Sequence, residues 1–249
     1  MALARREIEQ RYRGSIAGIG WTLLQPMALL LLLTTVFGVL LKSRWSAESS
    51  TLDFALFLFV GLIFYNFVAE CMQQAPTLIT NNPNYVNKIA FPLELLPWVS
   101  VLVAGFQAIV SLLLLYLAAV LIRGDIHLSW ALVPLLFVPA TLVCLALGWF
   151  LSALGVYIRD TRQIVAILTP ALMFLTPIFY SSSNVPEDFQ ALLSLNPLTG
   201  VVEEGRRMVL GGAMPDFLTL GYNSAISLSV ALLALAWFQK LRKGFAGAL

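Results

Sequence analysis

The sequence predicts an all-α integral membrane protein with six transmembrane helices, an N-terminal interfacial helix and short re-entrant helices on the outer face between spans five and six. Of the 249 residues, 59% are hydrophobic and only 11% are charged, whereas soluble domains carry about 25% charged residues. The mean hydropathy is +0.87. Because so few charges cannot form a water-facing surface, most of the protein surface must contact lipid.

Residues 1–19 are basic and weakly amphipathic, which is typical of a helix that lies along a membrane surface. Ile8, Tyr12 and Ile16 share one helical stripe that can rest against acyl chains. The arginines of this segment can then reach lipid phosphates, or they act only as the positively charged flank of the first span. The arginines concerned are Arg5, Arg6, Arg11 and Arg13.

Six apolar stretches follow, each about long enough to cross the hydrocarbon core, which takes roughly 20 helical residues. They cover residues 21–41, 54–72, 95–122, 132–158, 164–180 and 220–238. An even number of spans places both termini on one side, and ten of the 15 Lys and Arg residues fall on that side. Basic residues gather in cytoplasmic loops, so both termini are predicted to be cytoplasmic.

The loop between spans two and three predicts a short cytoplasmic helix over residues 83–90. Asn82 followed by Pro83 is a helix-start signal, with Asn82 as the N-cap and Pro83 in the first helical position. The helix must end before Phe91, because Phe91 precedes Pro92 and the residue before a proline avoids helical geometry.

Residues 181–217 are too charged to cross the membrane and too apolar to leave it. Residues 189–195 and 198–210 have the apolar content of two short helices, which Asn196 and Pro197 separate. A full crossing would bury four charges at high cost. Two re-entrant helices that dip into the outer leaflet fit better, provided that they are buried in protein or face water, and a dimer provides such surroundings. The four charges are Glu203, Glu204, Arg206 and Arg207.

The sequence lacks the patterns of an enzyme or of a self-powered carrier. It has no Gly-x-x-x-x-Gly-Lys-Ser/Thr phosphate loop, no Gly-x-Ser-x-Gly elbow and no His-Glu-x-x-His helix. Glu70 and Glu94 lie near span ends, whereas coupled carriers usually need ionisable groups near the midplane. Cys71 and Cys144 lie in apolar runs and are expected to pack rather than pair. We therefore expect no catalytic residue, cofactor, metal or nucleic acid here, and an external energy source for any transport.

Seven segments of the sequence form an ordered set of motifs: Arg11–Ser15, Gly20–Pro26, Asn66–Phe67, Asn87–Pro97, Val156–Asp160, Asn196–Gly200 and Gly211–Gly212. In these motifs and their order, the sequence resembles ABC transporter permeases of the type-2 exporter class along nearly its whole length. Within the family it is similar to subunits that export lipid-linked O-antigen, teichoic acid or capsule polysaccharide. The tail at residues 245–249 has Gly247 where the family commonly has Asp.

The resemblance implies that residues 1–249 form one transmembrane domain of a homodimer in the bacterial inner membrane. Two copies of a separate ABC nucleotide-binding subunit would hold ATP and Mg²⁺ on the cytoplasmic side. The helix at residues 83–90 then corresponds to the coupling helix that docks into the ATPase, with Asn84, Tyr85 and Lys88 as contact residues. The alternative is a capped surface helix without that role.

Arg159 and Asp160 occupy the second cytoplasmic turn, between spans four and five. They either transmit ATPase motion or form an interfacial ion pair, which contributes at most about 1 kcal/mol when exposed. Residues 1–19 resemble the cytoplasmic gate helix of the family. The arginines of this helix would then meet the pyrophosphate of a lipid-linked glycan, because guanidinium groups match phosphate geometry.

Aromatic side chains in and after spans two and five are candidates for a translocation path, since aromatic faces stack on sugar C–H surfaces. Packing and interface roles are the alternatives for the same side chains. The candidate path residues are Phe57, Phe64, Tyr65, Phe174 and Tyr180. The outer re-entrant segment at residues 181–217 is a candidate exit gate, with Asn196, Pro197, Glu203 and Arg206 as its key residues.

The leading hypothesis is the membrane-spanning subunit of an ATP-driven exporter of lipid-linked, O-antigen-like polysaccharide. Two alternatives stay open: an ABC permease for a drug or small lipid, and a non-transporting membrane scaffold or assembly factor. Neighbouring glycosyltransferase genes would favour the polysaccharide. A scaffold predicts that substitutions in Asn84–Lys88 leave transport unaffected while partner binding elsewhere is lost.

Overall fold

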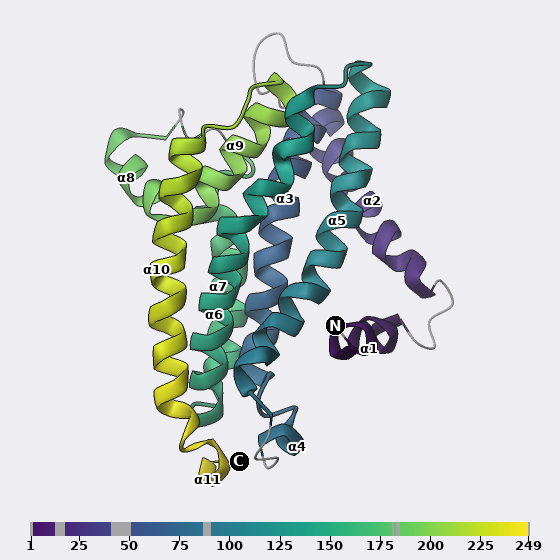
Figure 1. Cartoon of the computed structure of the whole chain (residues 1–249). Helices are drawn as coiled ribbons and strands as arrows, with labels where there is room; N and C mark the ends of the chain where they lie inside the picture. The colour runs from purple at the N-terminus through teal and green to yellow at the C-terminus, as the bar shows by residue number, and fades with distance from the viewer. Residues whose placement is uncertain are drawn as a thin grey trace.

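The computed structural model describes residues 2–12, 18–40, 51–86, 91–180, 182 and 185–248. Within these ranges all regular structure is helical, which confirms the all-α class. Figure 1 shows an elongated bundle in which the long helices run roughly side by side. Four helices are long and apolar enough to cross a membrane, and two shorter apolar helices accompany them. The four are Leu52–Thr77, Leu93–Arg123, Leu128–Tyr157 and Phe217–Arg242, and the shorter two are Trp21–Val36 and Thr161–Leu175.

The helices follow one another along the chain with short connections. Their bounds are α1 (Ala2–Tyr12), α2 (Trp21–Leu33), α3 (Thr51–Gln74), α4 (Pro83–Val86), α5 (Leu96–Arg123), α6 (Phe137–Tyr157), α7 (Thr161–Leu175), α8 (Glu187–Leu195), α9 (Pro197–Gly211), α10 (Phe217–Arg242) and α11 (Phe245–Ala248). Five short 3₁₀ or π segments join them: η1 (Gly18–Gly20), η2 (Thr34–Leu40), η3 (Ala75–Thr77), η4 (Leu93–Leu95) and η5 (Leu128–Leu136).

Helix α3 forms the centre of the bundle. Of the 18 residues in its apolar stretch, 83% are buried, whereas only 17% are buried in the corresponding stretch of α10. Helices α5, α6, α7 and α9 all contact α3, and α10 packs mainly against α6. Apolar surface therefore meets protein around α3 and is left for lipid on the outside of α10. Cys71 and Cys144 are free and buried within this core, which confirms their expected packing role.

In the first and fifth predicted spans, the α-helix ends well before the predicted span does. The first continues beyond α2 as the π segment η2, where the Thr34 and Thr35 hydroxyls donate to the Leu30 and Leu31 carbonyls at 2.7 and 2.8 Å. The fifth was expected to run to residue 180, but α7 ends at Leu175. The next residue, Thr176, precedes a proline and is extended, as the steric clash with a following proline ring demands.

The two ends of the bundle carry different elements. Helices α4 and α11, with the C-terminus, lie at the lower end in Figure 1, and α8 and α9 lie near the upper end. Helix α1 and the N-terminus lie in the lower half, beside α5. The predicted coupling helix and both termini therefore share one half of the molecule, opposite the α8–α9 hairpin.

Close backbone contacts hold α6 against the rest of the bundle. A Cβ atom at Gly155 would lie 2.0 Å from the Pro76 carbonyl oxygen in η3, and one at Gly148 would lie 2.8 Å from Pro97 Cβ. Glycine is required at both positions, because α6 approaches the Pro76 backbone and the Pro97 ring too closely for a side chain.

Gly155→Ala tests this contact, because the added methyl group overlaps backbone that cannot move aside. Overpacking of this kind costs about 1–3 kcal/mol, so the melting temperature of the purified protein should fall. Gly221→Ala on α10 is the control, since nothing lies within 4 Å of its added Cβ, and it should melt at or slightly above the wild-type temperature. Equal melting temperatures for the two variants would contradict the close packing of α6 on η3.

Candidate functional site

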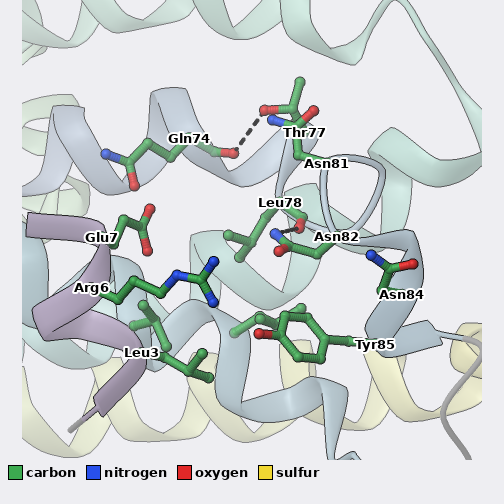
Figure 2. Close-up of a pocket in the computed structure, with 12 residues that line it drawn as sticks. Leu3, Arg6, Glu7, Gln74, Thr77, Leu78, Asn81, Asn82, Asn84 and Tyr85 are labelled. Carbon is green, nitrogen blue, oxygen red and sulfur yellow. Dashed lines mark hydrogen bonds between the residues drawn. The ribbon is translucent and has the colours of Figure 1, made fainter. Parts of the chain in front are cut away.

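A cleft of about 590 Å³ separates α1 from the connection between α3 and α5. We call it the α4 cleft. Figure 2 shows the Arg6 guanidinium directed from α1 into this cleft, toward the segment that carries Leu78 and Tyr85. Asn84 lies on the same segment. The structure thus brings together Arg6, predicted as a gate residue, and Asn84 and Tyr85, predicted as ATPase contacts.

Local hydrogen bonds build the wall of the α4 cleft opposite α1. The Thr77 hydroxyl donates to the Gln74 carbonyl at 3.4 Å, and the Asn82 amide donates to the Leu78 carbonyl at 2.9 Å. Helix α4 begins at Pro83 as predicted. The Asn82 side chain, predicted as the N-cap, instead reaches back to the preceding turn. The backbone carbonyl of Asn82 accepts from the Tyr85 N–H at 3.0 Å.

The contact residues predicted on α4 are partly accessible. Asn84 is exposed, and Tyr85 is half-buried with its ring stacked on Phe91 at 4.5 Å between centroids. The helix is described to Val86. Residues 87–90, which include Lys88 and the predicted end of the coupling helix, lie outside the described residues.

Within the predicted gate helix at residues 1–19, the structure describes residues 2–12 and 18–19. Helix α1 ends at Tyr12, and the chain is described again from η1, where Gly18 has a φ of 50°. Arg6 is exposed and lines the α4 cleft. The side chains of Arg5 and Arg11, and the whole of Arg13, lie outside what the structure describes.

The turn between α6 and α7 exposes both Arg159 and Asp160. The Asp160 carbonyl accepts from the N–H groups of Gln163 and Ile164 at 2.9 and 3.0 Å, so this residue starts α7 through its backbone. The ion pairs found among the described residues include neither side chain. Both charges are therefore available on the surface of this turn.

Polar contacts tie the segment after α4 to the last long helix. Arg242 at the end of α10 pairs with Glu94 in η4 at 2.6 Å. The Trp149 indole N–H on α6 donates to the Glu94 carbonyl at 3.0 Å. The C-terminal ends of α6 and α10 are joined as well, because the Tyr157 hydroxyl donates to the Leu241 carbonyl at 2.9 Å. This lower end is a connected unit rather than a set of loose loops.

At the opposite end, α8 and α9 meet at Asn196, which confirms the predicted break at Asn196-Pro197. The Asn196 side-chain oxygen accepts from the Leu198 N–H at 3.0 Å and caps α9, with Pro197 in the first helical position. Its amide nitrogen donates to the Thr176 hydroxyl at 3.0 Å and to the Leu175 carbonyl at 3.3 Å. One side chain therefore starts α9 and fastens it to the end of α7.

Side chains from α5 and η5 satisfy the other end of α9. The last carbonyls of a helix have no donor within the helix. Here Ser129 and Trp130 donate to the Met208 and Val209 carbonyls at 2.8 and 3.1 Å. Arg123, which also pairs with Asp53 at 2.7 Å, donates to the next carbonyl, that of Leu210. Sequence reasoning missed these partners, because only the fold brings residues about 80 positions apart into contact.

Arg206 lies at the middle of this arrangement and is only 5% exposed. Its guanidinium donates to the carbonyls of Phe57, Pro177 and Ile178 at 3.2, 2.5 and 2.7 Å. The Phe57 ring lies 3.5 Å below it, in cation–π geometry. Burial lowers the pKa of Arg206 to about 9, which still leaves it charged at neutral pH. Arg206 thus clamps α9 onto α3 and onto the turn after α7.

The two acidic residues near Arg206, Glu203 and Glu204, differ in burial and in their contacts. Glu203 is half-buried, whereas Glu204 is buried. Glu204 accepts from the Asp216 N–H at 2.7 Å and pairs with Arg207 at 3.3 Å. Asp216 in turn caps α10 by accepting from the Leu218 and Thr219 N–H groups at 3.0 and 3.3 Å. Sequence reasoning singled out Glu203, but Glu204 makes the structural contact.

The candidate path aromatics fall into two groups. Phe57, Phe64 and Tyr65 are less than a tenth exposed, so in this conformation they offer no surface to a passing molecule and instead form the core around α3. Tyr65 also donates its hydroxyl to the Thr169 carbonyl at 3.0 Å. Phe174 is 63% exposed, and Tyr180 is half-buried with its hydroxyl bonded to the Phe174 carbonyl. Contact with a transported glycan stays a prediction for all five.

The bundle of long apolar helices, with polar contacts gathered at its two ends, defines a helical membrane protein. Residues 1–208 match the family of ABC-2 type transporters, and the chain belongs to this family. The O-antigen export system permease protein RfbA of Myxococcus xanthus is 27% identical over 253 residues, which cover 99% of this chain and 93% of that relative. RfbA of Klebsiella pneumoniae is 21% identical over 99% of the chain and 93% of its own length. The polysialic acid transport protein KpsM of Escherichia coli is 24% identical over 96% of the chain and 91% of its own length.

Arg206→Met should destabilise the protein strongly, because it leaves the Pro177 and Ile178 carbonyls, which lie outside the helices, without this donor. Unsatisfied buried groups cost about 1–3 kcal/mol each, so for two carbonyls we expect a loss of about 2 kcal/mol or more and a melting temperature lower by roughly 4–8 °C. Arg207→Met is the matched control, since the Arg207 side chain is 55% exposed and its ion pair contributes at most about 1 kcal/mol. A similar melting temperature for the two variants would contradict the clamp.

Proposed function

We propose that this chain is the membrane-spanning subunit of an ATP-driven exporter that moves lipid-linked, O-antigen-like polysaccharide across the bacterial inner membrane. The observation that carries the proposal is the likeness, over 96–99% of the chain, to permeases named for O-antigen export and polysialic acid transport. The ordered motifs of the sequence point the same way. The cargo is thus assigned by likeness to relatives, and the roles below by the position of each residue in the bundle.

In this proposal the chain crosses the membrane six times. The four long helices and the two shorter apolar helices supply the spans. Both termini and α4 lie on the cytoplasmic side, where ten of the 15 Lys and Arg residues fall, and the α8–α9 hairpin lies at the outer face. The shared lower half of the termini and α4 supports this orientation.

The α8–α9 hairpin is proposed to be re-entrant at the outer leaflet. Irregular backbone and charged side chains are tolerated at membrane depth when protein satisfies them. The carbonyls around Arg206, the contacts of Glu204 and the capped ends of α9 meet this requirement. As an exit gate it would work as a rigid element, moving with α3 rather than unfolding.

Energy is proposed to come from two copies of a separate ABC nucleotide-binding subunit, which hold ATP and Mg²⁺, acting on a homodimer of this chain. Asn84, Tyr85 and Lys88 of the coupling helix dock into that subunit, and the exposed turn of Arg159 and Asp160 faces it. The ion pair of Glu94 with Arg242 supports transmission of the motion, because it joins the segment after α4 to α10.

The basic N-terminal helix is proposed to receive the pyrophosphate of the lipid carrier. Arg6 supports this role because it lines the α4 cleft, where an anion can approach the guanidinium from solvent. Arg5, Arg11 and Arg13 would add positive charge around the same group.

Deleting the gene in its native host tests the proposed function. We expect surface polysaccharide to be lost and lipid-linked glycan to build up on the cytoplasmic side, with both effects reversed by the wild-type gene. The tagged chain should co-purify as a dimer with two ATP-binding subunits. Undiminished surface polysaccharide in the deletion strain would refute the proposal, and accumulation of a drug or small lipid instead would identify a different cargo.

Replacing Tyr85 and Lys88 together by alanine tests the coupling helix. Loss of two interface contacts worth about 1 kcal/mol or less each should reduce affinity for the ATP-binding subunit about tenfold. The amount of folded membrane subunit should not change, since Tyr85 is only half-buried. Lys240→Ala, an exposed basic residue at the same end, is the control and should leave co-purification unchanged. Normal docking and normal ATP hydrolysis in the double variant would contradict the assignment.

A further inference from the structure

A second cavity, of about 310 Å³, lies between α2, α3 and α5. We call it the polar cavity. Apolar side chains form part of its wall, but six of its lining side chains end in an amide or a carboxylate. These six are Gln25, Asn66, Glu70, Gln73, Gln74 and Gln107.

The polar cavity is unusual because it opens on helices that are otherwise apolar. Asn66, Glu70 and Gln73 follow one another at helical spacings of four and three, so they share one face of α3. Asn66 and Gln73 are exposed, although most of α3 is buried. Exposed amides and a carboxylate on a membrane helix are costly in lipid and mark water-filled or ligand-binding surfaces.

Hydrogen bonds within the cavity orient some of these groups and leave another without a partner. The Gln107 amide donates to the Thr22 carbonyl at 2.7 Å, which ties α5 to α2. The Gln74 amide nitrogen donates to Glu70 at 3.2 Å. The Gln74 side-chain oxygen is buried and has no hydrogen-bond partner among the residues that the structure describes. A buried acceptor without a donor is destabilising, so a hydroxyl group that reached it would be bound favourably.

The polar cavity adjoins the α4 cleft, because Gln74 lines both. Figure 2 shows the Gln74 side chain extending toward the α1 side of the cleft, above Glu7. Polar side chains therefore follow one another from the cleft, where Arg6 offers a cation, along α3 to Glu70 and Asn66. The cationic end suits a phosphate group, and the amide end suits uncharged hydroxyl groups.

We propose that the polar cavity binds single sugar units of the transported polysaccharide. Amides donate and accept hydrogen bonds, and the Glu70 carboxylate accepts two hydroxyls, as recognition of a sugar diol requires. The cavity has the volume of a small ligand site. Each neutral hydrogen bond is weak, so a sugar can bind and leave. This inference rests on the proposed function, and it adds the place where the cargo is held.

Site-specific photocrosslinking in cells that make the polysaccharide tests the proposal. A photoreactive benzophenone amino acid replaces Asn66 or Gln73 in the full chain, expressed with its ATP-binding subunit. Illumination should yield products that stain for carbohydrate and shift to high mass. The control position is Leu113, which lies on α5, is 62% exposed and does not line the cavity; it should crosslink to lipid.

Carbohydrate-free products at positions 66 and 73, whether lipid or a second copy of the chain, would overturn the proposal. A second measurement keeps it open to refutation if the large photoreactive group disturbs folding. Glu70→Gln keeps the shape of the side chain and removes its charge, and should lower the export rate about tenfold with unchanged amounts of assembled complex. An export rate equal to that of the wild type would also overturn it.

The proposed function and the sugar site can be refuted separately. A deletion strain that still exports polysaccharide refutes the proposed function itself. A deletion strain that loses surface polysaccharide, combined with normal export by Glu70→Gln and carbohydrate-free crosslinks at Asn66, refutes only the sugar site.

Discussion

The hydrogen bonds of Arg206 to three carbonyls are the interaction on which the upper half of the molecule depends. Without them, α9 would leave a buried cation and the backbone groups after α7 unpaired in surroundings that water does not reach. Asn196 at the start of α9 and Ser129 and Trp130 at its end meet the same demand. A helix that carries Glu204 and Arg206 can therefore lie inside the bundle, because other parts of the chain supply the partners of these two side chains.

The lower half is organised differently. The α4 cleft and the polar cavity contain amides and charges that line open space, whereas the groups around Arg206 are enclosed and paired. Closed networks rigidify a structure, while accessible polar groups are free to meet a ligand or a partner. The contrast agrees with the proposed function, in which the cargo and the ATPase would be received at one end while the other end stays rigid.

Helix α3 connects the two halves. It presents Phe57 to the Arg206 clamp at one end and Gln74 to both cavities at the other, about 25 Å apart along the helix axis. Because α3 is packed on nearly all sides by α5, α6, α7 and α9, it can shift only together with its neighbours. A displacement at the cleft would therefore be carried to the hairpin.

The sequence by itself determined the all-α class, the apolar helices and the starts of α4 and α9, because helix length, proline geometry and capping are local properties. Asn196-Pro197 needed no tertiary information to be recognised as a break between two helices. Only the tertiary structure decided that Phe57, Phe64 and Tyr65 pack in the core, that Arg6 shares a cleft with Asn84 and Tyr85, and what Arg206 binds. These outcomes depend on contacts between residues far apart in the chain, for which periodicity and spacing carry no signal.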